Sequence, residues 1–127
     1  MSENGMSDYE SIVKRYIEVW NETDPQARRV AIDALFTEDV TFADPMAAAR
    51  GQSEIDWMIG GVQAQFPGFV ITPLGAVDGH HDQARFGWEM GLPGQEAPVA
   101  GFDVVTVAAD GRINQVLGFL DRVPAQG

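Results

Sequence analysis

The sequence predicts an α+β fold in which a helical layer packs inside a curved antiparallel sheet. In the N-terminal half of the 127-residue chain, apolar residues recur at helical spacing, whereas from Phe69 onward they recur at every second position. Short turn sequences separate the alternating segments, such as Pro93-Gly94 and Asp110-Gly111. Helices followed by a run of neighbouring strands are typical of this fold class.

The first helix is predicted to begin at a capping box in which Ser7 is the N-cap and Glu10 reaches back to its amide. The following apolar side chains fall on one stripe of a helix. This stripe consists of Tyr9, Val13, Tyr16 and Trp20, flanked by Ile12 and Ile17. The polar residues 21–23 are expected to end the helix.

A second helix is predicted to begin at Asp24-Pro25, because aspartate is a good N-cap and proline fits the first turn. Its expected apolar side is formed by Val30, Ala31, Ala34 and Leu35. A turn at residues 37–39 and a short strand at 40–42 should follow, ending at Asp44-Pro45. After an alanine-rich loop, a third helix is predicted from Ser53 to about Gln65.

Four strands are predicted in the C-terminal half, at residues 69–74, 84–90, 99–107 and 113–121. In the third of them, alternation places Asp103 on the same face as Val105 and Val107. A carboxylate among valines loses its hydration, which is costly unless it is paired or protonated. Asp103 is therefore a candidate functional residue with a raised pKa.

Composition excludes several classes of function. The formal net charge of −11 repels nucleic acids and anionic membranes, so neither is an expected partner. The chain contains no cysteine, and no apolar run approaches the roughly 20 residues that span a bilayer. No basic segment followed by an apolar one marks a signal peptide at the N-terminus, so a cytoplasmic protein is expected.

Four segments, considered together, resemble a known family: residues 15–21, 37–45 and 51–55, and Asp103 followed by residues 110–113. Their order and spacing are similar to those of the nuclear-transport-factor-2-like superfamily, especially its ketosteroid isomerase and SnoaL-like polyketide cyclase branches. The resemblance implies a cone-shaped α+β fold with a pocket between three helices and the bent sheet. It implies one domain over residues 7–123, with flexible termini at 1–6 and 124–127.

The resemblance also implies roles for single residues. Asp44 matches the catalytic base of the isomerases, Asp103 their neutral hydrogen-bond donor, and Tyr16 their oxyanion-binding tyrosine. Supporting tyrosines of the steroid isomerases are replaced here by Phe36 and Ile59, which should raise the pKa of Tyr16 and loosen its position. Substrate-binding residues are expected at Trp20, Phe36, Met58, Phe86, Trp88, Met90, Val116 and Leu120.

Structural alternatives exist for each of these residues. Asp44 before Pro45 can form an Asx turn, Asp103 can be a buried acid satisfied by an amide or a tyrosine, and Tyr16 can be a core residue. His80 and His81 face opposite sides of a strand and no cysteine could complete a site, so no metal is predicted. They fit a polar turn; a proton-shuttling His80 at the pocket mouth is the alternative.

The leading functional hypothesis is an enzyme that acts without a cofactor, by acid–base catalysis, on a hydrophobic carbonyl compound. Isomerisation, cyclisation and dehydration all remain open, with a steroid or a polyketide as the type of substrate. The alternative is a non-catalytic ligand-binding or dimerising module with the same pocket. The sequence does not decide between these functions.

Both faces of the predicted sheet are apolar. Opposite Asp103 lie Phe102, Val104 and Thr106, and the last strand adds Ile113, Leu117 and Phe119. Helices can cover only one face, and the other would leave a large exposed apolar patch. A homodimer through the outer sheet face is therefore expected.

Overall fold

The computed structural model describes residues 3–124, and within them the side chains of residues 8–124. Residues 1–2 and 125–127, which belong to the predicted flexible termini, lie outside the described residues. Three helices and six strands follow one another in the order α1 (Glu3–Asn21), α2 (Pro25–Leu35), β1 (Phe36–Ala43), β2 (Ala48–Arg50), α3 (Gln52–Gln65), β3 (Val70–His80), β4 (Gln83–Gly91), β5 (Val99–Val107) and β6 (Ile113–Arg122).

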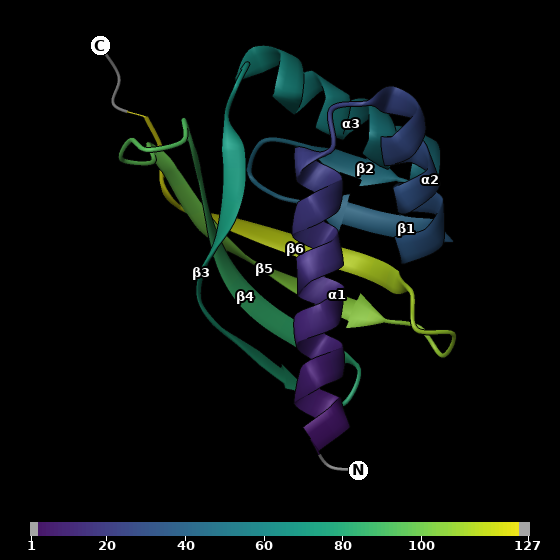
Figure 1. Ribbon diagram of the computed structural model, residues 1–127. Coiled ribbons are helices and arrows are strands. Elements are labelled where there is room, and N and C mark those ends of the chain that lie inside the picture. Colours follow the sequence, from purple (N-terminus) through teal and green to yellow (C-terminus); the bar gives the residue numbers. More distant parts are fainter. Residues whose placement is uncertain (1–2, 125–127) are drawn as a thin grey trace.

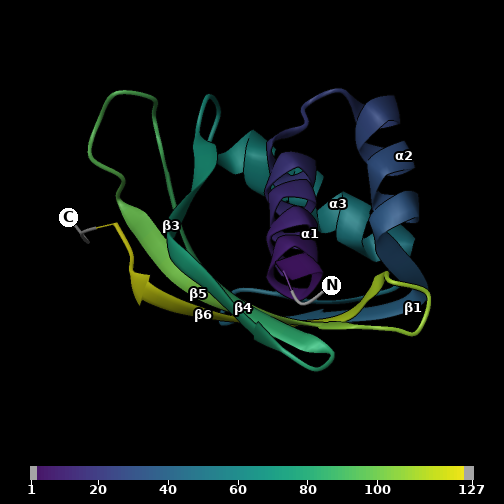
Figure 2. The ribbon, with the colours of Figure 1, turned by 60° about the horizontal axis from the view of Figure 1, so that its bottom comes forward.

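All six strands form one curved sheet in the order β2-β1-β6-β5-β4-β3, and the helices lie on its concave side (Figures 1 and 2). Strands β3 to β6 form the predicted antiparallel meander. The sheet as a whole is mixed, because β1 lies parallel to β6. This arrangement confirms the predicted cone-shaped α+β fold. Among the helices of residues 3–124, none has the length and apolar character that a membrane span requires.

Helix α1 lies against β3 and contributes the predicted apolar stripe to the core. Val13, Tyr16 and Ile17 are buried, and Trp20 packs against the same cluster. At the end of the helix, the side-chain amide of Asn21 donates to the carbonyl of Ile71 and accepts from its N–H, both at 2.8 Å. The predicted N-cap is wrong: α1 begins at Glu3, so the backbone at Ser7 is already helical.

Helix α2 begins as predicted, with the Asp24 carboxylate accepting from the backbone N–H of Ala27. Its predicted apolar face is only partly correct, because Val30 is 70% exposed and Ala34 is exposed as well. The buried face carries Arg28, Ile32 and Leu35 instead. The buried face was not recognised from the sequence because it includes a charged side chain, and only apolar side chains were used to define the face.

Two predictions around β1 are corrected. Residues 37–39, expected as a turn, belong to β1, and the register against β6 shifts between Phe36 and Thr41. The alanine-rich segment expected as a loop contains strand β2, which pairs with β1 through three residues. A three-residue edge strand of small side chains carries too little alternation to be recognised.

The four C-terminal strands are present, and β5 has the predicted bounds. Strand β3 extends to His80, beyond the predicted end at Leu74. In β6, Ile113 is buried in the core, whereas Leu117 and Phe119 lie exposed on the outer face. The pairing of β5 with β6 shifts in register between Thr106, which lies opposite Gln115, and Val107, which lies opposite Ile113. Such an irregularity moves the side chains that follow it to the other face of the sheet.

Candidate functional site

Asp103 lies on the concave face of β5, between the helices and the sheet. Its cross-strand neighbours are Phe86 on β4 and Gly118 on β6, and only 5% of the residue is exposed. Val105 on the same face is fully buried. The chain therefore places a carboxyl group in the apolar surroundings that alternation predicts.

Two side chains donate hydrogen bonds to this carboxyl group. The Tyr16 hydroxyl donates to Oδ2 at 2.7 Å, and the Trp88 indole Nε1–H donates to Oδ1 at 3.1 Å. Each oxygen thus accepts one hydrogen bond from a side chain, which offsets part of the cost of burial. Trp88, expected as a substrate-binding residue, thus lies in direct contact with Asp103.

Burial raises the pKa of Asp103 from 3.8 to about 6, the nearby Asp44 adds to the increase, and the hydrogen bonds from Tyr16 and Trp88 oppose it. The predicted increase is therefore confirmed in direction. The expected neutral state at pH 7 is not, because a group with a pKa of about 6 is mostly ionised there. Both donors favour the charged form, which explains why burial alone does not keep the acid neutral.

Tyr16 stays a hydrogen-bond donor at neutral pH. Burial and then the charge of Asp103 raise its pKa well above the usual value of 10. Phe36 packs edge-on against the phenol ring, with ring centroids 6.1 Å apart. The ring is buried and its hydroxyl is bound to Asp103. The expected loosening of Tyr16 stays a prediction.

Asp44 follows β1 and forms the predicted Asx turn. Its Oδ1 accepts from the backbone N–H groups of Met46 at 2.9 Å and Ala47 at 2.8 Å. A Cβ atom added to Gly118 would lie 2.9 Å from Oδ1 of Asp103 and 3.0 Å from Cβ of Asp44, so these two atoms are no more than about 6 Å apart. The turn anchors one oxygen of Asp44 and leaves Oδ2 without a hydrogen bond among the described side chains.

Both acids line a cavity of about 510 Å³ between the sheet, α1 and α3. Most of the predicted site residues also line it: Tyr16, Trp20, Met58, Phe86, Trp88, Met90 and Leu120. Phe36 and Val116 do not, because they are 1% and 0% exposed within the core. They support the cavity wall from behind, so their predicted contact with a ligand is corrected.

Several lining residues were not predicted. They are Ile17, Phe42, Met46, Ala47, Val62, Gln65, Phe66, Ile71, Val99, Val123 and Pro124. Spacing could have revealed Val62, which lies one helical turn after Met58. Ile71 and Phe66 could not be recognised, because the sequence does not show how the end of α3 lies relative to the edge of the sheet.

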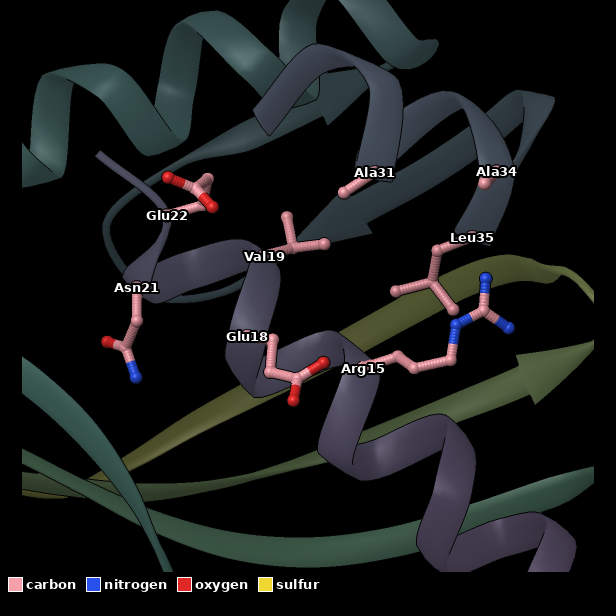
Figure 3. Close-up of a pocket in the computed structure, with 8 residues that line it drawn as sticks. All are labelled: Arg15, Glu18, Val19, Asn21, Glu22, Ala31, Ala34 and Leu35. Carbon is pink, nitrogen blue, oxygen red and sulfur yellow. The ribbon is translucent and has the colours of Figure 1, made fainter. Parts of the chain in front are cut away.

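A second cavity, of about 430 Å³, lies between α1 and α2 (Figure 3). Its lining consists of Arg15, Glu18, Val19, Asn21, Glu22, Ala31, Ala34 and Leu35. Neither Asp44 nor Asp103 reaches it, and its charged side chains are the exposed Arg15 and Glu18 of α1 and the partly buried Glu22, which follows the helix. The cavity with the two acids is therefore the candidate functional site.

The two histidines lie away from this cavity. His80 ends β3 opposite Gln83, and His81 occupies the tight turn that follows, with a φ of 53°. Neither residue lines the cavity, so the alternative of a proton-shuttling His80 is contradicted. Within the described residues, no group of three or more histidine or acidic side chains is placed to hold a metal ion.

Comparisons with known proteins agree with this arrangement. The family described as the SnoaL-like domain matches residues 13–116. The chain is 34% identical to a "putative isomerase of the SnoaL-like family" from Agrobacterium tumefaciens str. C58, with a TM-score of 0.88 over 91% of this chain and 99% of that one. A search of curated proteins finds no significant match.

Two more distant crystal structures share the fold. A "putative polyketide cyclase" from Sinorhizobium meliloti is 23% identical, with a TM-score of 0.68 over 85% of this chain and 93% of that one. An "NTF2-like protein of unknown function" from Cytophaga hutchinsonii is 14% identical, with a TM-score of 0.67 over 89% of each chain.

Proposed function

Because the chain belongs to the SnoaL-like domain family, we propose that it is an enzyme acting on a hydrophobic carbonyl compound by acid–base catalysis. One observation carries the proposal: Asp44, Asp103 and Tyr16 all line one apolar cavity of about 510 Å³. An apolar pocket with a few polar groups is typical of a small-molecule site. Acids in two different environments suit two different roles in proton transfer.

In the proposed reaction, Oδ2 of Asp44 removes a proton from the carbon next to the substrate carbonyl. The electron pair of the broken C–H bond moves onto the carbonyl oxygen and forms an enolate. The Tyr16–Asp103 pair stabilises this oxygen through a hydrogen bond. Asp44 then returns the proton to a different carbon of the substrate, which completes an isomerisation. Alternatively, the enolate carbon attacks a second carbonyl group and closes a ring, and the alkoxide formed from that carbonyl takes the proton from Asp44.

Binding of substrate favours the donor form of this pair. Burial is the largest cause of the raised pKa of Asp103. A hydrophobic ligand that fills the cavity removes further water and shifts the carboxyl group toward its neutral form. The steps need only proton transfer and rearrangement of bonds within the substrate, so we propose no cofactor.

The family relationship supports an isomerase or a cyclase. The relative at 34% identity is described as a "putative isomerase", and the more distant one from Sinorhizobium as a "putative polyketide cyclase". Steroids and polyketides are both large, apolar and rich in carbonyl groups, which fits an apolar and aromatic cavity lining. We propose this substrate class without distinguishing between the two.

The test is turnover of a panel of hydrophobic ketones by the wild type and by Asp44→Asn. Loss of the base should lower kcat by at least a hundredfold, because general base catalysis contributes about 10²–10⁴. Ligand affinity should change little, since the amide keeps the shape of the side chain. Asp78→Asn is the control, because this exposed acid of β3 lies outside the cavity. Full activity of Asp44→Asn would refute the proposed role.

The second candidate is a ligand-binding module without catalysis. One observation favours it: in the free protein, Asp103 is mostly ionised at pH 7 and each oxygen already accepts a hydrogen bond. Such a group cannot donate to a carbonyl oxygen. Tight binding of hydrophobic ketones with no turnover of any of them, at any pH between 5 and 8, would support the module over the enzyme.

A further inference from the structure

We propose that Trp88 is a positioning residue, which reserves one oxygen of Asp103 as an acceptor and directs the acidic proton to the other oxygen, beside Tyr16. Its kinetic consequence rests on the proposed function, whereas its effect on Asp103 can be measured in the protein alone. Trp88 was expected only as part of the pocket wall. Its indole nitrogen also donates a hydrogen bond to Oδ1 of Asp103.

The position of the indole ring is fixed by the pairing of β4 and β5. Trp88 lies opposite Gly101, and a Cβ atom at Gly101 would be 3.0 Å from Cζ2 of the ring. Because Gly101 has no side chain, the ring can lie across β5 and reach the next residue on the same face, Asp103. The contact of Nε1 with Oδ1 at 3.1 Å is thus a result of strand register.

An indole nitrogen can only donate a hydrogen bond. Oδ1 of Asp103 must therefore remain an acceptor as long as this contact persists. When the carboxyl group takes up a proton, the hydrogen is carried by Oδ2, the oxygen that lies 2.7 Å from the Tyr16 hydroxyl. The proton is consequently held on the oxygen next to Tyr16. There the neutral carboxyl group and the Tyr16 hydroxyl together can donate a hydrogen bond to the substrate oxygen.

Trp88 also lowers the pH at which Asp103 takes up this proton. Its hydrogen bond stabilises the ionised carboxylate, as does that of Tyr16, whereas burial and the nearby Asp44 act in the opposite direction. These are the charged and titratable groups that face Asp103: Tyr16 from α1, Asp44 after β1, with Trp88 from β4 as the neutral donor. Removal of the indole N–H should leave a carboxyl group that binds its proton more tightly.

The experiment compares Trp88→Phe with Trp57→Phe. Phenylalanine keeps an aromatic ring in the cavity but has no N–H, and Trp57 is a matched control because it is 84% exposed on α3. The midpoint of Asp103 is followed by ¹³C NMR of aspartate carboxyl groups, with the signal assigned by its loss in Asp103→Asn. We expect a midpoint of about 6 for Asp103 in the wild type. In Trp88→Phe this midpoint should rise by roughly one pH unit, which is a tenfold gain in proton affinity.

A measurement on the wild type covers the case in which Trp88→Phe does not fold. The indole N–H resonance of Trp88 should shift with the same midpoint near 6, and this shift should disappear in Asp103→Asn. An unchanged or lower midpoint in Trp88→Phe would overturn the proposal, as would an indole resonance that does not respond to pH.

Kinetics add a readout that a purely structural role would not give. In Trp88→Phe, the midpoint of the fall in kcat/KM on the alkaline side should shift to higher pH by the same amount, roughly one pH unit. A uniform loss of activity without such a shift would contradict the positioning role. If no ketone is turned over by any variant, the proposed function fails, while the NMR midpoints still decide the role of Trp88.

Discussion

At the residue scale, the protonation of Asp103 links the candidate site to the stability of the fold. The pKa of this residue is about 6 in the folded protein, against 3.8 in the unfolded chain. Between these two values the folded protein binds the proton more tightly than the unfolded chain does. The contribution of Asp103 to stability is therefore fully present below about pH 4 and is lost as the pH rises through about 6.

This linkage predicts a pH-dependent difference between the wild type and Asp103→Asn. From pH 4 to pH 6.5, the wild type should lose about 2 kcal/mol of unfolding free energy relative to the variant. The difference arises because asparagine does not titrate. Urea denaturation at closely spaced pH values measures it. Parallel curves for the two proteins would show that Asp103 has no raised pKa.

At the element scale, the contact between α2 and α3 depends on the buried Arg28. Its guanidinium group donates to Asp56 and Gln63 on α3, each at 2.8 Å. It passes Gly60 so closely that a Cβ atom there would lie 3.2 Å from Nη2. Gly60, which has no side chain, is thus the place where the arginine crosses α3.

Arg28→Met should destabilise the protein by about 3–5 kcal/mol, because it leaves Asp56 without its cationic partner in a partly buried position. Arg29→Met is the matched control on the same helix. Arg29 pairs with Asp33 at the exposed surface, where an ion pair of this kind contributes about 0.3–0.5 kcal/mol. Thermal and urea unfolding of both variants checks the contrast. Equal effects would show that burial of Arg28 has no energetic consequence.

The same elements show what could be predicted from the sequence and what could not. Strand β5 has the predicted bounds, since alternation is a local property that survives folding when one face is buried. The buried face of α2 was misplaced because it depends on Asp56 and Gln63, which lie about 30 residues further along the chain.

The candidate site shows the same limit. Asp103 could be singled out from its neighbours in the strand, and the family resemblance supplied Asp44 and Tyr16. The hydrogen bond from Trp88 to Asp103 was not foreseen, although it contributes, after burial and the hydrogen bond from Tyr16, to the charge of the acid. It follows from strand register and from the absent side chain of Gly101, and register is not visible in a single strand.

At the scale of the whole molecule, the outer face of the sheet remains apolar. Phe102 and Phe119 stack there with ring centroids 4.9 Å apart, and Phe119 and Leu117 are 48% and 37% exposed. Arg85 covers one side of this pair, 4.8 Å from the Phe102 ring centroid. No helix of the described chain lies on this face (Figure 2). We propose that a second copy of the chain covers it.

The wild type should accordingly behave as a homodimer at micromolar concentration in multi-angle light scattering. Phe119→Asp should shift the mass toward that of one chain, because a charge at the centre of an apolar interface is not compensated. Trp57→Asp places the same charge on the exposed surface of α3 and should leave the mass unchanged. A wild type that elutes as a stable single chain would exclude the proposed dimer.

The two hydrogen bonds between Asn21 and Ile71 bear on how such copies can meet. Strand β3 is an edge strand of the sheet. Unpaired N–H and C=O groups on an edge strand can pair with a strand from another molecule. At Ile71, the Asn21 side chain already binds both the N–H and the C=O group, so these groups are not available to another strand. Two residues further along, Pro73 has no N–H to offer. Because these positions of the β3 edge cannot pair with another strand, they favour the proposed face-to-face pair over an extending β-fibre.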